Sequence, residues 1–196
     1  MLLWTSGAVL DELTFDGPFQ GGQAHRCNEL FARIRAVYEE RGTTSRLQNL
    51  HVKMYTHRGQ FSCLTAKAAE SRALIPVLLQ ICKEEGVDSR SERDTHRILM
   101  LQYLDRVIRI IMEGDLVLSD AEADAALEAY EDFLQHYHVL ARWSIEKGVR
   151  NYNFVFKHHH LWHIIDHCRF INAKYIWAYE FEDLFLHFSY EKIFTS

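Results

Sequence analysis

The chain has 196 residues, of which 48% are hydrophobic, and its formal net charge is −5 with histidine neutral. This length suits one domain, and the hydrophobic content is sufficient to bury a core, which excludes wholesale disorder. The mild acidity argues against a protein coated in basic surface, although it is compatible with a local basic patch. Two prolines and nine glycines are few for a loop-rich β fold, so the composition favours a helical protein.

Cysteine usage and the N-terminal sequence point to an intracellular protein. The four cysteines form no Cys-x-x-Cys pair and match no disulfide framework, so we expect reduced thiols. The first residues carry no positive charge and reach Asp11 and Glu12 too soon for a signal peptide. No uncharged run approaches the roughly 18 residues that a membrane-spanning helix needs, and we therefore expect no membrane partner.

Residues 1–25 lack a periodic hydrophobic pattern. They contain turn signals at Gly17-Pro18 and Gly21-Gly22, which predict a loop-like N-terminal segment. From residue 26 to residue 196, apolar residues recur at helical spacing, and we expect a single helical domain. The fold class predicted is all-α, an irregular array of six or seven helices without a substantial sheet. The predicted helices cover about 26–42, 46–57, 65–85, 92–113, 119–147, 156–171 and 178–194.

Local signals add detail to two of these helices and mark one short strand candidate between helices. Pro76 falls inside the segment 65–85, so either the helix kinks there or a new helix begins with Pro76 in its first turn. Ser119 and Glu122 form a capping box, which marks the start of the helix predicted over 119–147. The best strand candidate, residues 151–156, is short.

Six metal-ligand side chains lie within eleven residues, because His158, His159, His160, His163, His167 and Cys168 follow one another closely. His159, His163 and His167 repeat every four residues and therefore share one face of a helix. Neutral imidazoles at this spacing can chelate Zn²⁺ or another divalent metal. One helix face rarely completes a tetrahedral site alone, so the alternative interpretations are a structural cluster and adventitious metal binding during purification.

Arginines gather near the start of the segment 92–113. The spacing of Arg90, Arg93 and Arg97 places them on one side, where they could contact the phosphates of a nucleic acid. The alternative interpretation is the polar face of an amphipathic helix.

Several motifs between residues 60 and 190 occur in a distinctive order. They are Lys67-Ala-Ala-Glu-Ser-Arg72 with Leu74-Ile-Pro-Val-Leu78, an acidic helix with Phe133-Leu-x-x-Tyr137, Lys157-His-His-His-Leu-Trp-His163, and Trp177-Ala-Tyr-Glu-Phe-Glu182. This order resembles the C-terminal helical region of large cut-and-paste DNA transposases of the CACTA type and their domesticated relatives.

The resemblance implies a relationship to an RNase-H-like core that carries a helical insertion. In that family two Asp and a late Glu hold two divalent metals, usually Mg²⁺, which activate the attacking oxygen. Glu182 is the best match to the late Glu, and the resemblance implies a nuclear location. The upstream β-rich part that supplies the two Asp residues has no counterpart here, and Asp11 and Asp16 are too close together to replace them. We therefore expect no catalysis by this chain alone and no required cofactor.

Three functions stay open at this point. The chain is a non-catalytic helical domain, or a truncated remnant, of a transposase-like protein that acts through protein or DNA contacts. Alternatively, it is a metal-binding helical protein that uses the cluster from His158 to His167. A third alternative is a protein-interaction module whose aromatic segment 178–194 forms the partner surface.

Overall fold

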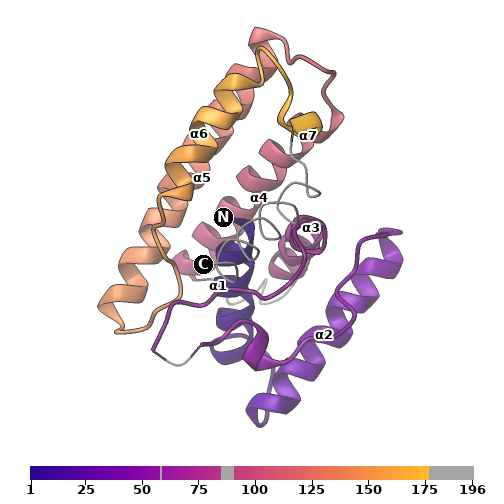
Figure 1. Ribbon diagram of the computed structural model, residues 1–196. Coiled ribbons are helices and arrows are strands. Elements are labelled where there is room, and N and C mark those ends of the chain that lie inside the picture. The colour runs from indigo at the N-terminus through magenta and orange to yellow at the C-terminus, as the bar shows by residue number, and fades with distance from the viewer. Residues whose placement is uncertain (58, 85–90, 177–196) are drawn as a thin grey trace, which may run out of the picture.

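The structure is a computed structural model that describes residues 1–57, 59–84 and 91–176. Within these ranges the chain forms α-helices and one 3₁₀ turn but no β-strand, which confirms the predicted all-α fold class (Figure 1). The elements are α1 (Leu2–Phe15), α2 (Gln23–Glu40), η1 (Val52–Met54), α3 (Ala68–Glu84), α4 (Glu92–Glu113), α5 (Asp120–Glu146), α6 (Lys157–His167) and α7 (Ala173–Ile176).

The helices pack as a series across the molecule. α6 lies along α5, α5 packs on α4 in the most extensive contact, and α4 packs on α3. α1 and α2 contact α3 and each other, so α5–α6 and α2 occupy opposite sides of the molecule (Figure 1). One hydrophobic core runs through all of these contacts.

The prediction of a loop-like segment over residues 1–25 is wrong, because α1 occupies most of it. α1 is buried around nearly its whole circumference, with Ala8, Val9, Leu10 and Leu13 in the core. A helix that is buried on every side needs no polar face, so its sequence shows no amphipathic period. Gly7 allows the close packing, since a Cβ atom at this position would lie 2.7 Å from the Cα of Cys63.

The helix predicted over residues 46–57 is also wrong, because this segment is irregular apart from η1. Leu47 and Leu50 are buried as their spacing suggested. Their peptide groups, however, bond to side chains, since the amide of Leu47 donates to the Tyr38 hydroxyl and the thiol of Cys27 donates to the carbonyl of Leu50. Tertiary packing therefore satisfies backbone groups that a helix would otherwise satisfy.

The remaining predicted helices that lie in the described ranges are present. α3 continues through Pro76 as a single helix. α4 and α5 both begin at capping boxes, formed by Ser91 with Asp94 and by Ser119 with Glu122. The predicted helix 178–194 lies outside the described residues.

Residues 151–156 form no strand, although Tyr152 reaches the core from this segment. Among the helices that the structure describes, none combines the length and hydropathy that crossing a membrane requires.

Candidate functional site

Two of the three arginines predicted to contact nucleic acid point into the protein. The Glu12 carboxylate, whose side chain is 0% exposed, accepts a hydrogen bond of 3.1 Å from Arg93 Nε and one of 3.0 Å from Arg97 Nη1. The Tyr152 hydroxyl donates to the same carboxylate at 2.9 Å. We call these four residues the Glu12 cluster. It joins α1, α4 and the segment that leads into α6.

Two further carboxylates pair with the arginines at the edges of the Glu12 cluster. Arg93 Nη1 also pairs with Asp16 at 2.8 Å, and Arg97 also pairs with Asp94. Burial raises the pKa of Tyr152 well above its ordinary value, and the charge of Glu12 raises this pKa further, so the phenol stays protonated and donates. Arg93 and Arg97 are thus committed to carboxylates inside the fold, while Arg90 lies outside the described residues.

The histidine cluster divides into separate contacts along α6. His159 and His163 meet with their Nε2 atoms 3.0 Å apart, and both side chains are exposed. His167 lies one turn further on, where its ring is 6.2 Å from that of Phe170. Across the described part of the chain, no group of three His, Cys, Asp or Glu side chains has the arrangement of a metal site.

His158 and His160 do not join this pair. His158 is buried, with its Nδ1 3.0 Å from the backbone oxygen of Val155, and burial lowers its pKa. The ring of His160 instead contacts Phe156 edge-on at 4.5 Å.

A second histidine pair, which no motif in the sequence predicted, lies between α4 and α5. The Nδ1 atoms of His96 and His136 are 2.8 Å apart. Tyr103 stacks on His136, and Trp143 contacts His96 edge-on. Burial lowers the pKa of His136, and the neighbouring His96 lowers it further, so a neutral imidazole is available to accept the hydrogen bond.

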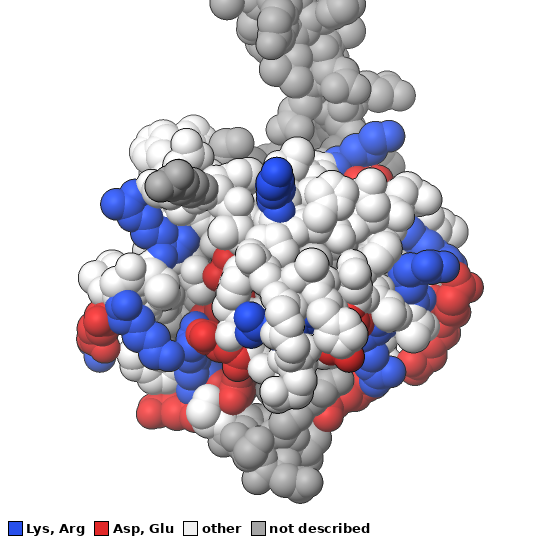
Figure 2. Space-filling model, turned by 90° about the horizontal axis from the view of Figure 1, so that it is seen from below, with Lys and Arg blue, Asp and Glu red and all other residues white. Residues whose placement is uncertain are grey.

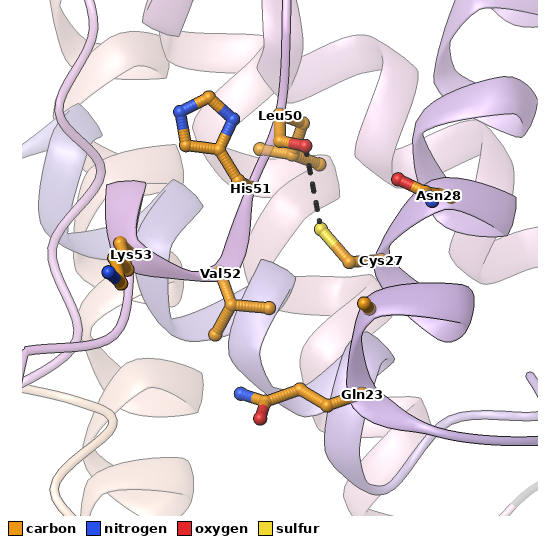
Figure 3. Close-up of a pocket in the computed structure, with 8 residues that line it drawn as sticks. Gln23, Cys27, Asn28, Leu50, His51, Val52 and Lys53 are labelled. Carbon is orange, nitrogen blue, oxygen red and sulfur yellow. Dashed lines mark hydrogen bonds between the residues drawn. The ribbon is translucent and has the colours of Figure 1, made fainter.

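A pocket of about 350 Å³ lies between the start of α2 and the segment around η1 (Figure 3). The thiol of Cys27 points toward the Leu50 carbonyl, 3.7 Å away, and accepts a hydrogen bond from Tyr55. Burial raises the pKa of Tyr55, which keeps this phenol protonated. The sulfur is therefore held in hydrogen bonds within the core. The residues that line the pocket are Gln23, Ala24, Cys27, Asn28, Leu50, His51, Val52 and Lys53.

The α4–α5 connection meets the α6–α7 connection beyond the end of α6 (Figure 1). Exposed apolar side chains lie on both connections. The two connections are joined by backbone hydrogen bonds from Asn172 N to Leu116 O at 2.7 Å and from Leu118 N to Cys168 O at 2.9 Å. Phe170 is 75% exposed here. The exposed residues, which we call the Phe170 patch, are Leu116, Val117, Phe170, Ile171 and Tyr175.

The Phe170 patch has a rigid base. The buried Asn172 side chain donates to the carbonyls of Ile111 and Asp115, at 2.9 Å each. Lys174 Nζ lies 3.2 Å from the carbonyl of Met112 at the C-terminal end of α4, where a cation interacts favourably with the helix dipole. The patch is therefore held on fixed backbone.

Carboxylates outnumber basic groups around the patch. Arg169 is bonded to three of them, Asp120, Asp124 and Asp166. Further exposed carboxylates nearby belong to Glu113, Asp115 and Glu122.

Glu182, the candidate catalytic residue of the resemblance, lies outside the described residues. Comparison of the chain with protein-family models, with curated proteins and with solved structures finds no match.

Proposed function

We propose that this chain is a non-catalytic helical domain of a transposase-like protein, and that it acts by binding a protein partner at the Phe170 patch. The order of motifs over residues 60–190 supports the first part. The observation that carries the second part is the exposed, rigidly held patch of five large apolar side chains. Contiguous exposed apolar surface of this kind is typical of interaction sites.

Charge favours a protein partner over a nucleic acid. The patch is surrounded by a surplus of carboxylates, which repel phosphate groups. Arg93 and Arg97 are occupied by Glu12 in the interior. On the face shown in Figure 2, the basic side chains lie in separate groups with uncharged and acidic side chains between them, so the described residues form no continuous basic track there.

The carboxylates around the patch also indicate the chemistry of the partner. Apolar side chains in the partner would cover Phe170 and its neighbours, and basic side chains at their edges would meet the surrounding carboxylates. An amphipathic segment that carries both leucine-type and lysine-type residues has this chemistry.

The test is fluorescence anisotropy with three labelled probes at about physiological ionic strength, where long-range attraction is screened. The probes are an amphipathic Leu/Lys peptide, the corresponding Leu/Glu peptide and a DNA duplex. We expect saturable binding of the Leu/Lys peptide only. Phe170→Ser is expected to weaken this binding by about 1–2 kcal/mol, roughly 5- to 30-fold in Kd.

Ile145→Ser is the matched control, because Ile145 is 71% exposed but lies near the opposite end of α5. It is expected to leave the peptide affinity unchanged. Tighter binding of the duplex than of the Leu/Lys peptide would contradict the proposal. An equal loss of peptide affinity in Phe170→Ser and Ile145→Ser would contradict it as well.

A further inference from the structure

The imidazoles of His159 and His163 are four residues apart on one helix face, a spacing at which two imidazoles can chelate one ion. They lie one turn apart on α6, and their Nε2 atoms are 3.0 Å apart. The rings stand nearly perpendicular, at 85°, with centroids 4.5 Å apart. Both Nε2 atoms thus lie close enough to bind a single ion.

Aromatic rings lie beside the two imidazoles. The ring centroid of Phe156 is 5.9 Å from that of His159, and the ring centroid of Trp162, which stands edge-on, is 5.3 Å from that of His163. Because both histidines are exposed, water can fill the remaining coordination positions.

The ligand chemistry indicates the class of metal. The 3.0 Å between the two Nε2 atoms is the length of a hydrogen bond between the imidazoles, and a bound ion would replace that contact. Imidazole nitrogens suit Cu²⁺ and Ni²⁺, and for a given set of nitrogen ligands the affinity is highest for Cu²⁺. Two cis nitrogens with water at the other positions fit the tetragonal or square-planar geometry of these ions, whereas a Zn²⁺ site in a protein usually has at least three protein ligands.

We propose that His159 and His163 bind a Cu²⁺ or Ni²⁺ ion through two cis Nε2 atoms, with water as the other ligands. His167, the third residue of the sequence prediction, is not part of this site because its ring lies against Phe170. The inference does not depend on the proposed protein partner, since the pair lies at the start of α6 and the Phe170 patch lies beyond its end.

The His96–His136 pair is a less suitable site, although its nitrogens are also close. Its Nδ1 atoms face each other between α4 and α5, and Tyr103 and Trp143 pack against the rings. An ion with a shell of water ligands would have to displace this packing. The exposed pair on α6 imposes no such cost.

The experiment is titration of untagged protein with Cu²⁺ or Ni²⁺ by calorimetry, with Cu²⁺ electron paramagnetic resonance as a second readout. Wild type should bind one ion at this site, with two nitrogen ligands in the spectrum. Even outer-shell partners are worth about 10- to 100-fold in metal affinity, so His163→Ala should weaken binding by at least about tenfold.

Two matched variants define the ligand set. His167→Ala removes the next histidine on the same exposed face, and His96→Ala disrupts the other pair. Both should bind the ion as wild type does. Circular dichroism of each variant shows whether α6 and the rest of the fold persist.

Three results would overturn the inference: no saturable uptake by wild type, unchanged uptake by a folded His163→Ala, or an equal loss in His167→Ala or His96→Ala. In each of these cases the affinity for the Leu/Lys peptide would still report separately on the Phe170 patch.

Discussion

At the scale of single residues, the charge of Glu12 is costly to bury, because its carboxylate is fully excluded from solvent. A buried charge is tolerated only when it is paired and hydrogen-bonded, and here Arg93, Arg97 and Tyr152 meet that requirement. These partners come from α4 and from the segment before α6. The cluster therefore fixes how three distant parts of the chain sit together.

Glu12→Gln removes the charge and leaves two buried guanidinium groups with less compensation. Breaking a buried pair in this way costs about 3–5 kcal/mol, and the lower end applies here because Asp16 and Asp94 remain. The free energy of unfolding, measured by urea denaturation, should therefore fall by about 3 kcal/mol. Glu131→Gln, at an exposed position on α5, should stay within about 0.5 kcal/mol of wild type. Equal stability of the two variants would contradict a central role for the cluster.

His158 makes the stability of the fold depend on pH. Burial lowers its pKa in the folded protein, so the unfolded chain binds more protons as the pH falls through the ordinary histidine value of about 6.5. The contribution of this residue is fully present above that value and is lost as the pH falls below it. Between pH 7.5 and 5.5, wild type should therefore lose more unfolding free energy than His158→Gln, as measured by urea denaturation at each pH. Parallel losses in the two proteins would rule out this linkage.

At the scale of elements, the sequence predicted a helix where one face is apolar, with or without a cap at its start. α4 was predicted from its apolar face alone, and α5 from its apolar face together with the cap at Ser119, and both starts were correctly placed. α1 was not predicted because a helix that is buried on all sides has no amphipathic period in its sequence. Residues 46–57 were wrongly predicted to be helical because their buried leucines have helical spacing. The hydrophobic pattern of a segment predicts which of its side chains are buried. It does not predict which groups form hydrogen bonds with its backbone.

The same limit applies to the candidate sites. The sequence placed Arg93 and Arg97 on one side of a helix, but their partner Glu12 is 81 and 85 residues away in a segment predicted to be a loop. His96 and His136 are 40 residues apart, and no local motif connects them. The spacing of His159 and His163 within one helix, by contrast, was sufficient to predict their contact.

The packing of α1 depends on a glycine. A Cβ atom at Gly7 would meet the backbone of Cys63 and Leu64 at 2.7 Å, and backbone atoms cannot move aside as the end of a side chain can. Gly7→Ala should therefore destabilise the protein by about 1–3 kcal/mol in a chemical denaturation experiment. Gly22→Ser, at the N-cap of α2 with open space around the position, should be neutral or slightly stabilising. Unchanged stability of Gly7→Ala would show that α1 does not pack this closely.

At the scale of the whole molecule, charge and exposed apolar surface point to the same kind of partner. The chain carries a net charge of −5, and eight acidic residues with no Lys or Arg occupy the sequence from Glu113 to Asp132. This acidic stretch begins beside the Phe170 patch. Arg93 and Arg97, two of the three arginines that suggested nucleic-acid binding, are paired with Glu12 inside the fold. We therefore expect a protein segment with basic and apolar side chains to bind at one end of the α5–α6 pair.

The most direct test of this claim is to map the backbone amide shifts of isotope-labelled protein during titration with the Leu/Lys peptide. We expect the largest shifts within residues 114–118 and 168–175, where the two connections form the patch. Shifts concentrated elsewhere, such as along the exposed surface around Ile145 and Phe154, would contradict it.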